Sequence, residues 1–346
     1  MTAEACRLFG VGLSGPVLLA EERAILEEQV PSAVILFRRN IETAADLSRL
    51  VGEIRDLPGR PLLLVDQEGG PVDRLRDLAG PFPSFHAAAR AGLARRAGEL
   101  VGRACALLGF DVDLAPVVDR RLPGAGESVL GERAAAANPE EIAAAARDFL
   151  DGLHAHGVGG CLKHFPGLGR ARFDTHHELP VLPEEPAELA EDLRPFRALR
   201  ELAGAVMVSH AASERDGIPA SLSEDVATRL LREELRFEGA ALSDDLEMGA
   251  LARFGGLPER SAAAANAGCD LVFVCSRIEE YPACVEAVER AVSEERRDEA
   301  VRRVEAYRER LDALRLAAPT TDGSLEELRE DVAELLALVG SSRDGR

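Results

Sequence analysis

The chain has 346 residues, 46% of them hydrophobic and 29% charged, and a formal net charge of −20 at pH 7. This is the composition of a globular protein that can bury a large core. The acidity disfavours nucleic acid or an anionic membrane surface as a partner, because both are bound through basic faces. Its six cysteines show neither CxxC pairs nor zinc spacing, and no export signal or membrane-length apolar run is visible. We therefore expect a soluble, cytoplasmic protein with reduced cysteines, as a monomer or weak dimer.

Short apolar segments alternate with helical patterns along the chain. Most of these segments are continuously apolar, as expected for strands that are covered on both faces in a parallel sheet. The helix candidates between them begin with residues 43–55 and 87–108 and continue with 139–156, 184–202 and 223–235. The eight strand candidates are residues 8–13, 33–37, 62–66, 112–117, 161–164, 205–210, 241–244 and 271–275.

Eight strands that alternate with helices predict an α/β fold, a (β/α)8 barrel of the TIM type. The alternative is an open, doubly wound sheet, which the lack of a GxGxxG motif after the first strand disfavours. The sequence after residue 275 is helical over 279–313 and again over 324–338, with a Pro/Thr/Gly break at 318–323. We expect one catalytic domain, 1–346, with residues 279–340 as extra C-terminal helices packed on the barrel.

Polar side chains follow four of the predicted strands. In a TIM barrel the carboxyl ends of the strands carry the active site. One carboxylate there could be a helix cap or a satisfied core group, but four such ends are hard to explain structurally. Lys163 is also the only lysine of the chain, which suggests a place where a compact ammonium is needed. The four ends are Asp66-Gln67-Glu68, Lys163-His164, His210 and Ser243-Asp244-Asp245.

Two further groups of residues fit a polar pocket. Arg74 and Arg133 could bind carboxylate or hydroxyl-rich ligands, although either could also be a solvated surface charge. Asp174 stands two residues before His176, where its carboxylate could orient the imidazole and raise its basicity. This pairing of an orienting group and a base is typical of enzymes, although no serine or cysteine nucleophile stands nearby.

With these residues assembled, the chain resembles glycoside hydrolase family 3, and within it the single-domain bacterial β-N-acetylglucosaminidases of peptidoglycan recycling. The resemblance covers residues 8 to about 275. Its motifs are ILFRRN at 35–40, LLVDQEGGPVDRL at 63–75, LAPVVD at 114–119, LGER at 130–133, KHFPGLG at 163–169, DTH at 174–176, PASLS at 219–223, LSDDLEM at 242–248 and AGCDLVFVC at 267–275.

The resemblance implies a role for each of these residues. Asp244 would be the nucleophile, and His176, paired with Asp174, the general acid/base. His210 and Met248 would line the pocket. The sugar subsite would take Asp66, Arg74, Arg133, Lys163 and His164. Neither a metal nor a cofactor is expected.

The sequence departs from the family pattern at three places. Pro71 replaces an arginine, Leu168 replaces the second histidine of a PGHG motif, and Ala134-Ala135 stand where serine and phenylalanine are usual. None of these changes removes a residue assigned to bond making, so they put substrate fit and loop behaviour in question more than the chemistry.

The implied reaction is that of a retaining exo-β-N-acetylglucosaminidase. Asp244 would attack the anomeric carbon of a terminal non-reducing N-acetylglucosamine and form a covalent intermediate, while His176 protonates the leaving oxygen. The substrates would be small peptidoglycan-derived carbohydrates. Four alternatives stay open. These are a glycoside phosphorylase of the same family, a metal-dependent hydrolase using His164, His176, His210 and Asp244, a non-catalytic sugar-binding barrel, and Schiff-base chemistry at Lys163.

Overall fold

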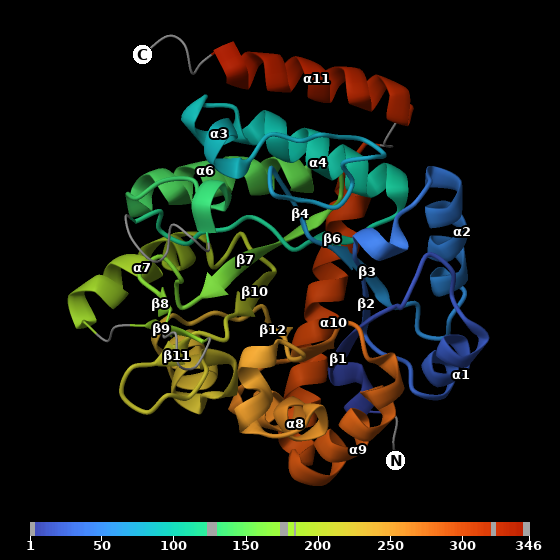
Figure 1. Cartoon of the computed structure of the whole chain (residues 1–346), viewed down its shortest axis with the longest axis vertical. Coiled ribbons are helices and arrows are strands. Elements are labelled where there is room, and N and C mark those ends of the chain that lie inside the picture. Colours follow the sequence, from blue (N-terminus) through green and yellow to red (C-terminus); the bar gives the residue numbers. More distant parts are fainter. Residues whose placement is uncertain (1–3, 123–129, 174–178, 183–184, 320–322, 342–346) are drawn as a thin grey trace.

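The computed structural model describes residues 4–122, 130–173, 179–182, 185–319 and 323–341. Eight parallel strands close into a barrel in the order β1-β13-β12-β10-β7-β6-β3-β2, with helices around it (Figure 1). The predicted (β/α)8 barrel is thereby confirmed, and the open doubly wound sheet is excluded. The strands of the barrel are β1 (Phe9–Gly12), β2 (Ala33–Leu36), β3 (Leu62–Val65), β6 (Val112–Asp113), β7 (Gly159–Phe165), β10 (Ala205–Val208), β12 (Ala240–Asp245) and β13 (Leu271–Val274).

Several helices begin where the sequence supplies capping residues. Thr43 accepts the N–H of Asp46 at the start of α2, and Asn138 accepts two N–H groups at the start of α6. The helices around and below the barrel are α1 (Ala20–Glu28), α2 (Ala44–Arg55), α3 (Phe85–Arg90), α4 (Ala94–Leu108), α6 (Pro139–His154), α7 (Pro186–Leu199), the π-helical η5 (Asp225–Glu234), α8 (Leu257–Ala267), α9 (Tyr281–Ala291), α10 (Glu294–Ala317) and α11 (Leu325–Ser341).

Some elements are shorter than their apolar patterns predict. The expected strand 112–117 is regular only over Val112–Asp113, because Pro116 has no N–H to donate to a neighbouring strand. The expected helix 87–108 is divided into α3 and α4, since Gly92 between them has φ of 71°. The expected helix 279–313 is likewise divided, because Ser293 caps a new helix by accepting the N–H of Arg296.

Helix α10, which runs lengthwise through the middle of the view in Figure 1, covers the end of the barrel where the strands begin, here called the lower end. Its side chains Val304, Tyr307 and Leu311 pack into the same cluster as the barrel interior. Two glycines make room for them, because a Cβ at Gly204 would lie 2.2 Å from the Tyr307 ring and one at Gly159 would lie 2.3 Å from Leu311. The Tyr307 hydroxyl donates to the carbonyl of Gly160 at 3.2 Å. The lower end is therefore filled by side chains.

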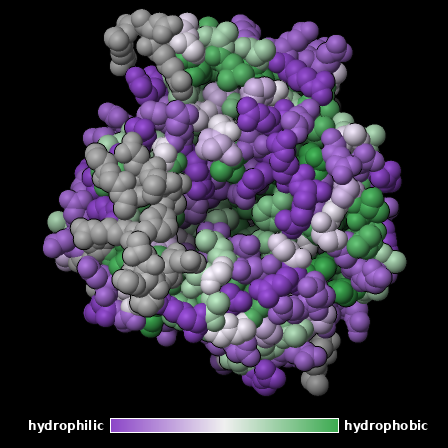
Figure 2. Space-filling model, in the orientation of Figure 1, coloured by the Kyte–Doolittle hydropathy of each residue, from purple (hydrophilic) through white to green (hydrophobic). Residues whose placement is uncertain are grey.

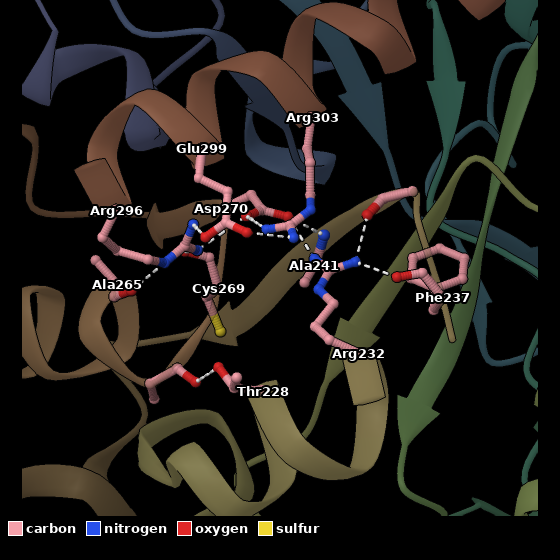
Figure 3. Close-up of polar contacts among 12 residues, drawn as sticks. Thr228, Arg232, Phe237, Ala241, Ala265, Cys269, Asp270, Arg296, Glu299 and Arg303 are labelled. Carbon is pink, nitrogen blue, oxygen red and sulfur yellow. Dashed lines mark hydrogen bonds and ion pairs between the residues drawn. The ribbon is translucent and has the colours of Figure 1, made fainter. Parts of the chain in front are cut away.

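Buried ion pairs hold α10 in this place. Asp270 accepts hydrogen bonds from Arg232 at 2.6 Å, from Arg296 at 2.8 Å and from the N–H of Ala241 at 2.9 Å, and Arg303 lies 3.4 Å away (Figure 3). Arg296 and Arg303 belong to α10, whereas Arg232 comes from η5. Asp111 has a similar place before β6, where it is paired with Arg55 of α2 and Arg315 of α10.

Smaller elements lie above the upper end of the barrel. A hairpin of β4 (Gln67–Gly69) and β5 (Val72–Asp73) follows β3, and a three-stranded sheet joins β8 (Arg172–Phe173), β9 (Pro180–Leu182) and β11 (Ala212–Ser213). Hydrophilic residues predominate on the face seen in Figure 2, with hydrophobic ones scattered between them. Within the described residues, no helix has the length and apolar character needed to cross a membrane.

Candidate active site

A cavity of about 250 Å³ opens at the carboxyl ends of the strands. Side chains from seven barrel strands or their following segments converge on it, as expected for the upper end of a TIM barrel. Its apolar lining comes from Ile35, Phe37, Val72, Met207, Phe273 and Cys275. Its polar lining comes from Asp66, Glu68, Arg74, Arg133, Lys163, His164, Asp244 and Asp245.

Lys163 lies at the centre of the polar lining and is only 2% exposed. Its Nζ is 2.7 Å from Oδ1 of Asp66 and 2.5 Å from Oε1 of Glu68. Burial favours the neutral amine, but the two carboxylates outweigh it and raise the pKa of Lys163 above its ordinary value. Lys163 is therefore an ammonium at neutral pH. This disfavours Schiff-base chemistry, which needs the free amine.

Glu68 is a central residue of the site to which the sequence assigned no role. Its carboxylate accepts hydrogen bonds from Nε of Arg133 at 2.8 Å and from a second guanidinium nitrogen of Arg133 at 2.9 Å, and it also pairs with Lys163. Burial acts to raise the pKa of Glu68, but Lys163 and Arg133 lower it to about 2. The alternation of the extended chain could have revealed it, because residues 66 and 68 share one face. Gln67, between them, bonds instead to Asp73 at 2.9 Å.

Lys163 and His164 are neighbours in the chain, yet both line the cavity. The pairing of β7 with β10 shifts here, since Met207 is opposite Lys163 and Val208 is opposite Phe165. His164 is thus an extra residue in the strand, as in a β-bulge, and its side chain is not turned to the opposite face. The peptide bond between Lys163 and His164 is cis.

Asp244 stands at the end of β12 and lines the same cavity. Its Oδ1 accepts the N–H of Asp245 at 2.8 Å. Burial alone would raise the pKa of Asp244, but the His210 and His164 rings, this N–H and Lys163 together lower it. Burial also raises the pKa of the adjacent Asp245 to about 6, with Glu247 and Asp244 adding to the shift. Asp244 is therefore ionised at neutral pH.

The end of β12 is held by hydrogen bonds to the next strand. Ser243 donates its hydroxyl to the carbonyl of Asp244 at 2.7 Å and accepts the N–H of Phe273 at 3.1 Å. Beyond it, Glu247 accepts the N–H groups of Ser276 and Arg277 at 2.6 and 3.0 Å. The backbone around Asp244 is therefore fixed on both sides.

The remaining predicted site residues lie in different surroundings. Arg74 lines the cavity, and its buried Nε has no hydrogen-bond partner among the residues that the structure describes. His210 stands behind the lining, with Nδ1 2.6 Å from the hydroxyl of Ser221 and Nε2 2.8 Å from the carbonyl of Asp245. Met248 is 42% exposed beyond β12. Asp174 and His176 lie outside the described residues.

The departures from the family pattern fall outside the charged lining. Pro71 is exposed between the two strands of the β4–β5 hairpin. Ala135 is buried in the main core. Leu168 and Ala134 pack in one small apolar cluster, together with Val117, Leu130, Ala171 and Ala211. Leu168 and Ala134, which both depart from the family pattern, therefore belong to the same cluster in space. Its apolar packing fixes the chain just after the KHFPG motif.

The hydrogen bonds of the histidines bear on the metal-hydrolase alternative. His164 has Asp119 at 2.7 Å from Nδ1 and Arg133 at 3.2 Å from Nε2, and both nitrogens of His210 are also engaged. Each of these ring nitrogens already has a hydrogen-bond partner, which a metal ion would have to displace. Within the described part of the chain, no three histidine, cysteine, aspartate or glutamate side chains are grouped so that they could hold a metal. The geometry favours chemistry by carboxylates.

An ionised carboxylate among cations at the carboxyl ends of a TIM barrel fits the site of a glycoside hydrolase. Residues 15–307 match the family profile described as "Glycosyl hydrolase family 3 N terminal domain". The chain belongs to glycoside hydrolase family 3.

Named relatives and solved structures agree with this assignment. The chain is 38% identical over 292 residues to a β-hexosaminidase of Thioalkalivibrio sulfidiphilus, covering 80% of this chain and 83% of that protein. Its fold superposes on a family 3 β-N-acetylglucosaminidase of Paenibacillus with a TM-score of 0.87, 31% identity, and coverage of 97% of this chain and 68% of that one. For NagZ of Neisseria gonorrhoeae the TM-score is 0.79, with 28% identity and coverage of 95% and 97%.

Proposed function

We propose that the protein is a retaining β-N-acetylglucosaminidase that removes terminal non-reducing N-acetylglucosamine through a covalent glycosyl-Asp244 intermediate. The observation that carries the proposal is the placement of Asp244, because it lines one cavity with Lys163, Arg133 and Arg74 and its pKa is lowered. The names of its relatives support the choice of sugar, and NagZ of N. gonorrhoeae has been solved in complex with N-trifluoroacetyl-D-glucosamine.

Each side chain of the site has its own role in the proposed reaction. Lys163, Arg133 and Arg74 supply hydrogen-bond donors to sugar hydroxyls, and Asp66 supplies an acceptor. The Asp244 carboxylate attacks the anomeric carbon, and the N–H of Asp245 holds that carboxylate in place. His176 protonates the leaving oxygen and then deprotonates water, with Asp174 orienting its ring. The roles of these two residues rest on the DTH motif at 174–176.

The proposal extends to the place of the enzyme in the cell. The substrates are peptidoglycan-derived fragments, and the enzyme acts in the cytoplasm. Both statements rest on the resemblance to enzymes of peptidoglycan recycling. Residues 1–346 act as one catalytic unit.

A comparison of aryl substrates tests the sugar and the reaction. We expect an aryl β-N-acetylglucosaminide to be hydrolysed much faster than the matching β-glucoside. Added phosphate is expected neither to speed turnover nor to give sugar 1-phosphate, either of which would identify the phosphorylase alternative. A fluorinated N-acetylglucosaminyl substrate should label Asp244, which mass spectrometry of the digest can localise. A label on another residue contradicts the assignment.

His176→Ala tests the acid/base role. We expect kcat/KM to fall on the order of 100-fold or more for substrates with poor leaving groups, since these need protonation. Activated aryl glycosides should lose far less in the first step. Equal losses on both kinds of substrate would contradict an acid role for His176.

A further inference from the structure

Asp119 is a buried carboxylate that contacts His164 and the chain just after it. Its Oδ2 lies 2.7 Å from Nδ1 of His164 and accepts the N–H of the same residue at 3.1 Å. Its Oδ1 accepts the N–H of Leu168 at 2.6 Å. Asp119 is only 1% exposed, so its charge is balanced by these donors and by the charges nearby. A carboxylate in this position decides which nitrogen of an imidazole carries the proton.

The opposite side of the His164 ring faces a group that can only donate. Nε2 lies 3.2 Å from a guanidinium nitrogen of Arg133, whose other contacts go to Glu68. Because arginine has no acceptor, the lone pair of Nε2 must receive this hydrogen bond. The ring proton therefore lies on Nδ1 and is donated to Asp119. The two ring nitrogens have opposite and defined roles.

We propose that Asp119 is a positioning residue that holds the ring proton of His164 on Nδ1, so that Nε2 is presented at the cavity as an acceptor. The cavity then offers the ligand an acceptor at His164 beside the donors of Lys163 and Arg133, so the ligand must present a hydroxyl hydrogen there. When that hydroxyl takes the lone pair of Nε2, one N–H of Arg133 becomes available to the same ligand. That the ligand is a sugar rests on the function proposed above.

A purely structural role for Asp119 is the competing explanation, because its bond to Leu168 also fixes the chain after β7. Asp270 at the lower end of the barrel provides a matched control. Asp270 is 0% exposed and likewise accepts a backbone N–H and charged side-chain donors. Removing either carboxylate costs stability, but only Asp119 contacts the cavity lining.

The ¹⁵N resonances of the His164 ring test the proposal directly in the full chain, with His164→Gln used for assignment. At neutral pH the wild-type ring should carry its proton on Nδ1 and show an unprotonated Nε2. In Asp119→Asn and Asp119→Ala the Nδ1–H form should lose population, more in the alanine variant. A protonated Nε2 in the wild type overturns the proposal, even if neither variant folds.

The second readout is the hydrolysis of an aryl β-N-acetylglucosaminide. We expect kcat/KM of Asp119→Asn to fall on the order of 10- to 100-fold, as for other residues that orient a ligating imidazole. Asp270→Asn should keep the wild-type value per folded molecule. A loss of activity with unchanged ring resonances, or no loss, overturns the role of Asp119. An inactive wild type would overturn the function proposed above instead, and the resonances would still decide the role of Asp119.

Discussion

The two ends of the barrel both bury carboxylates among cations, but they use the cations differently. At the lower end, the arginines around Asp270 also bind main-chain carbonyls, as Arg232 does with Phe237 and Gly239 at 2.8 and 2.7 Å. At the upper end, Lys163 and Arg133 share Glu68 and still face a cavity, and the Nε of Arg74 has no partner among the described residues. Ion pairs of a similar kind thus hold the fold together at the lower end and leave donors for a ligand at the upper end.

The largest expected effect separates chemistry from stability at the upper end. Asp244→Ala should lower kcat on an aryl β-N-acetylglucosaminide by about 10⁴-fold or more, as for removal of other enzymatic nucleophiles. Because Asp244 lines a cavity and its carboxylate accepts the N–H of the adjacent Asp245 rather than of a distant element, the melting temperature should change little. Steady-state kinetics and thermal unfolding of the same preparation measure both. A large fall in melting temperature would place Asp244 among the residues that hold the fold.

Asp270→Asn is the converse change at the lower end. Removing one partner of a buried charge cluster leaves the arginines uncompensated, so the free energy of unfolding should fall by about 3–5 kcal/mol. Urea unfolding measures the loss. The kcat/KM of the folded fraction should equal that of the wild type, and a selective loss of activity would show that the two ends are coupled.

Glu68→Gln should lower both the activity and the stability of the protein. With its bidentate partner gone, Arg133 loses its fixed place, and we expect KM to rise on the order of 10-fold. The pKa of Glu68 is about 2 in the fold against 4.5 ordinarily, so its stabilisation is present above pH 4.5 and is lost as pH falls toward 2. Unfolding at pH 7 and at pH 3 should therefore show a smaller difference between variant and wild type at pH 3. A difference independent of pH contradicts the ion pairing.

The smallest effects test how α10 fills the lower end. Gly204→Ala places a Cβ against the Tyr307 ring, and such overpacking costs about 1–3 kcal/mol. Gly52→Ala is the matched control, because Gly52 lies in α2 and a Cβ there meets nothing within 4 Å. The control should gain about 0.5–1 kcal/mol through helix propensity. Equal effects of the two substitutions would show that α10 does not pack tightly on the barrel.

The barrel could be predicted from the sequence because most of its strands are continuous apolar runs, the pattern that burial on both faces produces. The strand at 112–117 was predicted too long, since hydropathy does not register the missing N–H of Pro116. The charged residues at the strand ends could be predicted to converge, because parallel strands end together. Their partners could not, since Glu68 meets Arg133 and Asp119 meets His164 only when the barrel closes.

Two residues show where the prediction of the site stopped. Glu68 was visible in the motif but received no role, because pairing with two cations depends on distances that spacing alone does not give. His210 was expected to line the pocket, yet Ser221 and the carbonyl of Asp245 take both of its nitrogens. The catalytic roles of Asp174 and His176 remain predictions from the sequence.

Because side chains of α10 fill the lower end, the cavity at the carboxyl ends of the strands does not continue through the barrel. A polysaccharide could therefore not pass through the barrel, and on the proposed function we expect a glycan to be bound by its end. A high concentration of free sugar should then slow hydrolysis, because the sugar and a glycan end would compete for the same cavity.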